Sequence, residues 1–217
     1  MHCIIRFWAL IFWTSTVFCN PQIEELFQKA SDGNARAQFE LGLKYFNGDY
    51  LDRDYPEAIE WWTMSARQGN SAAMYELGLA YQKGFGVVVD SGTSVKWFIK
   101  AAEAGHSGAV TRLGTMYETG NGVLKDHAKA AMWFTIAAKK GDKVAQYRLG
   151  KLYYSGSFAI QNYVKSYMWL SIAAYYGDKY SSKLLLEVEK RMAPDETAKA
   201  KELAVPFIER FESQYGF

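Results

Sequence analysis

Residues 109–117 read Ala-Val-Thr-Arg-Leu-Gly-Thr-Met-Tyr, and versions of this stretch recur along the whole chain. The Leu-Gly pair returns every 36 residues, and a tyrosine lies four residues after each leucine. The positions are Leu41, Leu77, Leu113 and Leu149 for leucine, and Tyr45, Tyr81, Tyr117 and Tyr153 for tyrosine. Self-similarity at a fixed period of about 20–50 residues is typical of repeat proteins. The sequence therefore predicts four tandem copies of one structural unit.

Three further residues recur at the same 36-residue step, and we call each such set of equivalent positions a column. Their positions indicate that each copy consists of two helices. The columns are Gly48, Gly84, Gly120 and Gly156; Trp61, Trp97, Trp133 and Trp169; and Gly69, Gly105, Gly141 and Gly177. In the first copy, Ala37, Leu41, Gly42 and Tyr45 fall on one face of a helix with 3.6 residues per turn. The last glycine of each copy suits the left-handed position that ends many helices.

The second helix of each copy is predicted to begin at a residue whose side-chain oxygen can cap free amides. These residues are Asp54, Asp90, Asp126 and Asn162. Glu57, three residues after Asp54, is expected to complete a capping box. The tryptophan and a small residue four further on are expected to mark the buried face. The small residues are Ser65, Ala101, Ala137 and Ala173.

The glycine of each Leu-Gly pair needs a structural reason, because a glycine inside a helix costs roughly 1 kcal/mol relative to alanine. We expect a neighbouring helix to approach closely at this position, with the bulky tryptophan column filling the space of the missing side chain. A phosphate-cradling role is excluded because these glycines lie inside predicted helices.

The predicted organisation has a leader, an N-terminal cap, four repeats and a C-terminal cap. Residues 1–19 are predicted to be a signal peptide, and 20–33 an N-terminal capping helix. The repeats cover 34–69, 70–105, 106–141 and 142–177, and residues 178–217 are predicted to form C-terminal capping helices. Pro194 is expected to start the last helix and Pro206 to kink or break it. The fourth repeat has Gly156-Ser-Phe-Ala-Ile-Gln in place of the earlier Gly-Val loops, which predicts a loop of different shape.

The repeated pattern Ala-x-x-x-Leu-Gly-x-x-Tyr-x-x-Gly, then Asp, then Trp-x-x-x-Ala-Ala-x-x-Gly resembles the Sel-1-like repeat, a relative of the tetratricopeptide repeat. This resemblance implies an all-α fold, an α/α solenoid of tandem helix-turn-helix repeats forming a right-handed superhelix. It also implies an adaptor that gathers other proteins into complexes.

The first residues predict export to the periplasm or the medium. An uncharged run from Phe7 to Phe18 follows Arg6, and about 20 apolar residues are needed to span a bilayer. Cleavage is expected near Asn20, with an uncleaved anchor or a lipidated Cys19 as alternatives. Both cysteines of the chain, Cys3 and Cys19, lie in this leader. The mature chain is therefore expected to have no thiol for disulfides, catalysis or zinc.

Composition argues against nucleic-acid binding and against catalysis. The chain has 25 Lys+Arg and 23 Asp+Glu, a balance that provides no basic field for nucleic acid. The three histidines are His2, His106 and His127. We expect His106 to cap a helix and His127 to be exposed, so no metal, cofactor or small-molecule substrate is expected. Cysteine-rich relatives have been described as β-lactamase-like, but this sequence lacks their paired cysteines and the Ser-x-x-Lys, Ser-Asp-Asn and Lys-Thr-Gly groups.

The partner is predicted to be a protein or an extended peptide, bound on the concave face of the first helices. Positions 36, 39, 40, 43, 46 and 47 of the first repeat lie opposite the packing face, and the matching positions vary among repeats. Tyrosine and arginine are also frequent binding hot spots. The predicted site residues are Phe39, Leu43, Phe46, Tyr75, Leu79, Arg112, Tyr147, Arg148 and Tyr154. A host-directed secreted effector and an envelope-organising protein remain as alternatives.

Overall fold

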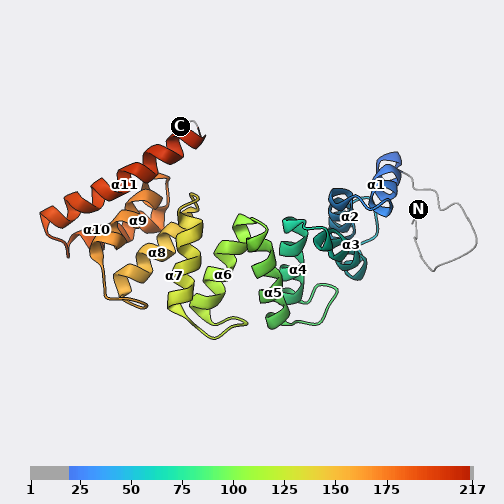
Figure 1. The fold of residues 1–217 in the computed structure, drawn as a ribbon, viewed down its shortest axis with the longest axis horizontal. Coiled ribbons are helices and arrows are strands. Elements are labelled where there is room, and N and C mark those ends of the chain that lie inside the picture. The colour runs from blue at the N-terminus through green and yellow to red at the C-terminus, as the bar shows by residue number, and fades with distance from the viewer. Residues whose placement is uncertain (1–19, 216–217) are drawn as a thin grey trace, which may run out of the picture. The chain divides into compact units, whose positions relative to one another are not determined.

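A computed structural model describes residues 20–215, and these residues form eleven α-helices and no strand (Figure 1). The helices are α1 (Pro21–Ser31), α2 (Ala35–Asn47), α3 (Tyr55–Arg67), α4 (Ser71–Lys83), α5 (Ser91–Glu103), α6 (Ser107–Thr119), α7 (His127–Ala138), α8 (Lys143–Ser155), α9 (Tyr163–Tyr175), α10 (Lys179–Glu189) and α11 (Pro194–Tyr215). Within each repeat the two helices pack against each other, as α2 does with α3 and α8 with α9. The predicted signal peptide, 1–19, lies outside the described residues.

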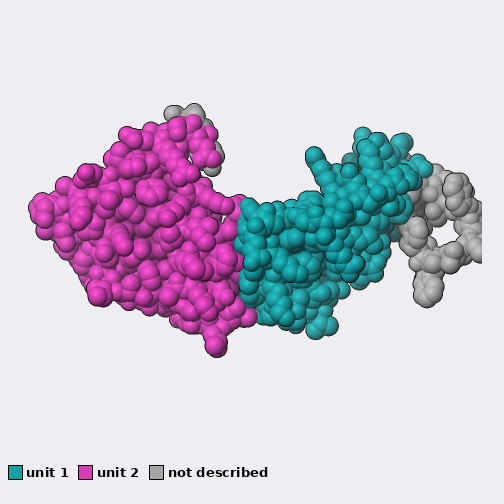
Figure 2. All heavy atoms as spheres, viewed as in Figure 1, with its two compact units in different colours: residues 1–106 teal, residues 107–217 magenta. Residues whose placement is uncertain are grey.

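The chain divides into two compact units between His106 and Ser107 (Figure 2). Helices α1 to α5 belong to unit 1, and helices α6 to α11 belong to unit 2. Each unit contains two of the repeated helix pairs and one end of the array.

The second helix of every repeat begins at the predicted capping residue. The side chains of Asp54, Asp90, Asp126 and Asn162 each accept a hydrogen bond from the amide three residues later, at 2.8–3.0 Å. The predicted capping box is wrong, because the Glu57 carboxylate accepts from Trp61 Nε1 at 2.9 Å instead. The Asp54 amide donates to the Tyr45 carbonyl at 3.0 Å.

Each repeat ends at a glycine in the left-handed conformation, as the sequence predicts. Their last glycines have left-handed φ angles of +87° to +91°, at Gly69, Gly105, Gly141 and Gly177. Most residues with a side chain are strained in this region of φ, whereas glycine is not.

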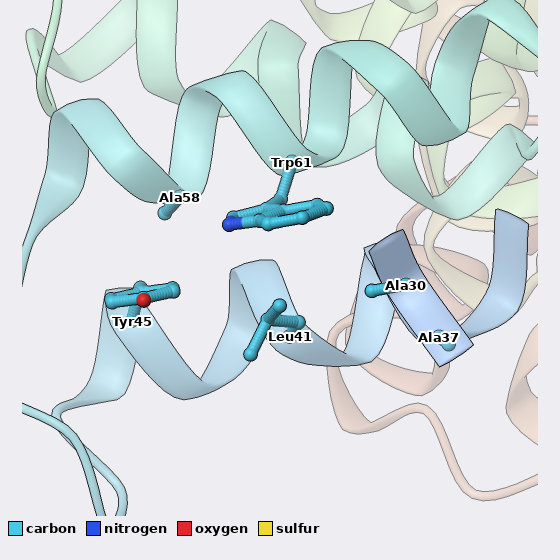
Figure 3. Packing of buried hydrophobic residues seen from close by; sticks show 6 residues of the cluster. All are labelled: Ala30, Ala37, Leu41, Tyr45, Ala58 and Trp61. Atoms are coloured by element: carbon cyan, nitrogen blue, oxygen red, sulfur yellow. The ribbon is translucent and has the colours of Figure 1, made fainter. Parts of the chain in front are cut away.

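The core of unit 1 confirms the predicted packing face of the first helix. Leu41 is fully buried, and Ala37 and Tyr45 lie with it on α2. Trp61 extends from α3 toward these side chains (Figure 3). Burial raises the pKa of the Tyr45 hydroxyl to about 12, with a further contribution from the Glu57 and Asp54 carboxylates. The repeated alanine and leucine are buried on all four first helices, whereas Tyr81, Tyr117 and Tyr153 are only half-buried.

The glycine of each Leu-Gly pair does receive a bulky side chain, but not the predicted one. A Cβ atom on Gly114 would lie 2.5 Å from Phe134 Cε1, and one on Gly42 would lie 2.5 Å from Trp62. The residue that fills the space is therefore the one after the tryptophan column. The four fillers are Trp62, Phe98, Phe134 and Leu170, and each is fully buried.

The tryptophan side chains do not face these glycines, because one step along a helix rotates the side-chain direction by about 100°. Trp61 packs edge-on against Phe27 of α1, with ring centroids 5.8 Å apart. Trp97 and Trp133 are only half-buried. The prediction that Trp133 is buried like Leu113 and Gly114 is therefore wrong.

The C-terminal end differs from the sequence-based expectation at Pro206. Helix α11 continues through this proline to Tyr215, so Pro206 does not end it. Helix α11 packs along α9, and Ala204 and Phe211 on either side of Pro206 are buried. Tertiary contacts on both sides of the proline hold the helix together despite the missing amide.

The loop of the fourth repeat does have a different backbone. Gly86 and Gly122 of the preceding loops have φ angles of +69° and +76°. Phe158 stands at their place, and among residues 20–215 the one non-glycine residue with positive φ is Tyr50. The Phe158 ring instead packs against Tyr153, with centroids 5.1 Å apart.

Candidate functional site

The predicted surface residues of α2 come together, but they also serve packing between repeats. Phe39, Leu43 and Phe46 are half-buried against a core cluster of the second repeat and its neighbours. That cluster consists of Trp62, Ala66, Ala73 and Leu77. The Phe46 ring lies 5.1–5.3 Å from three other rings, those of Tyr55, Trp62 and Phe85. The expectation that this face points freely to solvent is wrong for these residues, because consecutive repeats stack on it.

On α4, Tyr75 is half-buried between two rings. It stacks on His106 with centroids 4.3 Å apart and an interplanar angle of 18°, and it lies 5.5 Å from Phe98. Burial lowers the pKa of His106 and raises the pKa of Glu76, the residue after Tyr75. Leu79 is half-buried on the same helix. Tyr75 therefore exposes one part of its ring while the rest supports the end of the second repeat.

In unit 2, the predicted arginine of α8 links two repeats. The Arg148 guanidinium pairs with the Glu118 carboxylate of α6 and lies 5.9 Å from the centre of the Phe134 ring. Thr111 of α6 donates to the Asp142 carboxylate at 2.5 Å, which connects the same two repeats. Arg112 is half-buried on α6. Arg148 thus stabilises the stacking of first helices, and part of it remains accessible.

Tyr147 and Tyr154 lie on one face of α8 and meet side chains that the sequence reasoning missed. Tyr180 of α10 lies 6.1 Å from Tyr147, between ring centroids, and Tyr163 lies 6.0 Å from Tyr154. The Arg191 guanidinium lies 5.2 Å from the centre of the Tyr154 ring and donates to the Tyr163 hydroxyl at 3.5 Å. We call these five residues the tyrosine–arginine surface.

Some side chains of the tyrosine–arginine surface pack against the core, and the others are exposed to solvent. Tyr147, Tyr154 and Tyr163 are half-buried and pack against a cluster that includes Leu170 and Val188. Tyr180 is 73% exposed, and Arg191 is exposed as well. Aromatic rings that pack against the core on one side and are exposed on the other lose little side-chain entropy when they bind a partner. Tyr180 and Arg191 lie beyond the four regular repeats, so no repeated sequence position pointed to them.

The side chains that could ligate a metal ion do not cluster within residues 20–215. This part of the chain has no group of three or more His, Cys, Asp or Glu side chains that could hold a metal ion. His127 is half-buried, and not exposed as expected, with its Nδ1 atom 3.3 Å from the Ser157 carbonyl oxygen. Within the same range, no helix has the length and apolar character that crossing a membrane requires.

Stacked helix pairs with a variable, aromatic-rich surface on the first helices define an α-solenoid repeat protein. The model of the family described as Sel1 repeat matches residues 35–70, 71–106, 107–142 and 143–178. This chain belongs to the Sel1 repeat family. Proteins of this family are generally non-catalytic scaffolds that mediate protein–protein interactions.

Two solved structures share this fold at substantial identity. One is a protective antigen of uropathogenic Escherichia coli displaying an SLR fold, with TM-score 0.75 and 36% identity over 86% of this chain and 41% of that chain. The other is a Sel1 repeat protein from Oxalobacter formigenes, with TM-score 0.70 and 32% identity over 76% of this chain and 48% of that chain.

A curated relative is similar over a shorter stretch. The secretory immunoglobulin A-binding protein EsiB of Escherichia coli O6:H1 is 45% identical over 42 residues, which is 19% of this chain and 9% of EsiB. This chain thus covers less than half the length of each of these three proteins.

Proposed function

We propose that this chain is an exported scaffold that binds a partner protein or an extended peptide on the face formed by its first helices. The single observation that carries the proposal is the tyrosine–arginine surface. Five large side chains converge there, yet Tyr180 remains 73% exposed and Arg191 is exposed. Tyrosine and arginine side chains that are exposed in this way are the residue types enriched in binding hot spots.

The other predicted residues extend this proposed surface along each unit separately. In unit 1 the accessible parts of Phe39, Leu43, Tyr75 and Leu79 offer an apolar and aromatic face. In unit 2 the same face carries Arg112 and Arg148, both of which are half-buried, and Arg148 pairs there with Glu118. An extended peptide offers both backbone groups and side chains to such a face. The leader predicted for residues 1–19 supports export of the scaffold.

Photo-crosslinking in the cells that produce the protein tests this proposal. A photoreactive amino acid at position 180 should give a discrete higher-mass adduct, because this position lies at the exposed rim of the surface. The same group at Leu124, which is 91% exposed in a loop, serves as the control and should give none. Adding Arg191→Ala and Tyr154→Ala to the position-180 protein should remove the adduct while the helical circular dichroism stays unchanged. Equal adducts from positions 124 and 180 would refute the proposed location.

A secreted protein directed at host proteins is the second candidate function. The observation that favours it is the similarity to a protein named for binding secretory immunoglobulin A. Purified secretory immunoglobulin A, immobilised and titrated with the purified chain, discriminates between the two candidates. Saturable binding that Arg191→Ala weakens would favour the host-directed function.

A further inference from the structure

We propose that a second docking surface lies on α7, where Met132, Trp133 and Ile136 receive an amphipathic helix of a partner protein with acidic side chains along its flanks. This surface is on a second helix, so the proposal does not depend on the first-helix face proposed above. It rests on a comparison between two helices of unit 2, α7 and α9.

The two helices carry the same residues at the same repeat positions. Residues 129–138 of α7 and 165–174 of α9 both read Lys-x-x-Met-Trp-x-x-Ile-Ala-Ala. The first two repeats do not share this pattern, since Met64 and Lys100 stand where Ile136 and Ile172 stand. Methionine, tryptophan and isoleucine at these spacings form one apolar stripe along a helix.

In α9 this stripe is covered by helix α11 of the same chain. Met168, Trp169 and Ile172 are only 8%, 4% and 0% exposed. Trp169 packs against Phe207 of α11, with ring centroids 5.1 Å apart. Figure 1 shows α11 lying along α9, and the two helices contact each other. The structure therefore contains an example of the ligand that this stripe accepts, an amphipathic helix.

In α7 the identical stripe is partly exposed. Met132 is 52% exposed, Ile136 is 39% exposed, and Trp133 is half-buried. Helix α7 is apolar around most of its circumference, and helices of that kind are normally buried on all sides. Exposed large apolar side chains in a contiguous stripe mark an interaction site more strongly than scattered ones do.

The C-terminal part of α11 also lies close to the end of α7. The Phe211 ring of α11 lies within van der Waals distance of Gly141, 3.5 Å from where a Cβ atom would stand. Gly141 lies three residues after Ala138, the last residue of α7. The C-terminal part of α11 therefore reaches the loop that follows α7, so the α9–α11 interface ends close to α7.

Charge defines the partner further. Between residues 127 and 141 the chain has three lysines and no acidic residue. Lys139 and Lys140 are exposed, and Lys129 lies 3.7 Å from Asp126. A partner helix with acidic flanks complements this field, whereas a basic one is repelled. Helix α11 has this composition itself, with five acidic and three basic residues in 194–215.

A fluorescent peptide with the sequence of residues 194–215 is the probe, titrated against the purified full chain. We expect saturable binding. The double variant Met132→Ser/Ile136→Ser should weaken it about tenfold or more, because both apolar contacts are lost. Val144→Ser, at a residue of α8 that is 51% exposed, is the matched control and should leave the affinity unchanged. Melting curves should be similar for all three proteins, since the replaced side chains are exposed.

A peptide whose five acidic residues are replaced by lysine should bind at least about tenfold more weakly. Three results would overturn the proposal. The first is an absence of peptide binding, and the second is equal affinity for the parent and the α7 double variant. The third is a dimer of the full chain in sedimentation that the α7 double variant dissolves, because a second copy would then be the occupant.

Discussion

Replacing Gly114 with valine should lower the free energy of unfolding by about 3 kcal/mol or more, as overpacking in a helix contact does. The added Cβ atom would lie 2.5 Å from Phe134 Cε1 and 3.0 Å from Cζ. Phe134 is fully buried, so its ring has no free volume into which it can move. Chemical denaturation followed by circular dichroism measures the effect.

Two comparisons isolate the cause of this destabilisation. Gly92→Ala, at an exposed position of α5, should have a much smaller effect, because its Cβ atom would meet only Asp90 Oδ1, at 3.3 Å. Gly114→Ala combined with Phe134→Leu should cost less than the sum of the two single changes, because the smaller side chain relieves the clash. A Gly114→Val protein that unfolds like the parent would contradict the described packing.

Phe134→Ala should destabilise the fold by about 3–5 kcal/mol, whereas Trp133→Ala should cost clearly less. Phe134 is 0% exposed and sits over Gly114. Trp133 is half-buried, so its removal leaves no closed cavity. The same denaturation experiment, with both variants at equal concentration, measures the difference.

The contrast between neighbouring residues provides its own control, since both changes remove an aromatic ring from the same helix. If the Trp133→Ala protein is as unstable as the Phe134→Ala protein, the repeated tryptophan contributes as much to the core as the residue after it, which contradicts the described packing. This result would also indicate that the Trp133 side chain is held in the core and is not available to a partner.

The repeat pattern predicted the helix pairs well because the relevant physics is local and periodic. Capping by Asp126 depends on residues within one turn, and the left-handed Gly141 depends on its own backbone. The 36-residue step could not decide whether Trp133 or Phe134 faces Gly114, because both are apolar and adjacent. The continuation of α11 through Pro206 depends on contacts with α9, which are distant in sequence.

The candidate surface was predicted only in part, for a related reason. Variation among repeats identified Tyr147 and Tyr154, but it could not show that both rest on the cluster around Leu170. Phe46 was expected at the surface and instead lies among three aromatic rings of unit 1. Tyr180 and Arg191 fell outside the four regular copies, so column comparison did not reach them.

Amide hydrogen exchange of the chain, alone and in complex with the protein captured from position 180, tests the scaffold proposal most directly. We expect slower exchange on binding in α8 and α10, with the strongest change around Tyr154 and Tyr180. The loop around Leu124 should exchange at the same rate in both states. Protection confined to that loop, or protection that is absent from both α8 and α10, would contradict binding on the first-helix face.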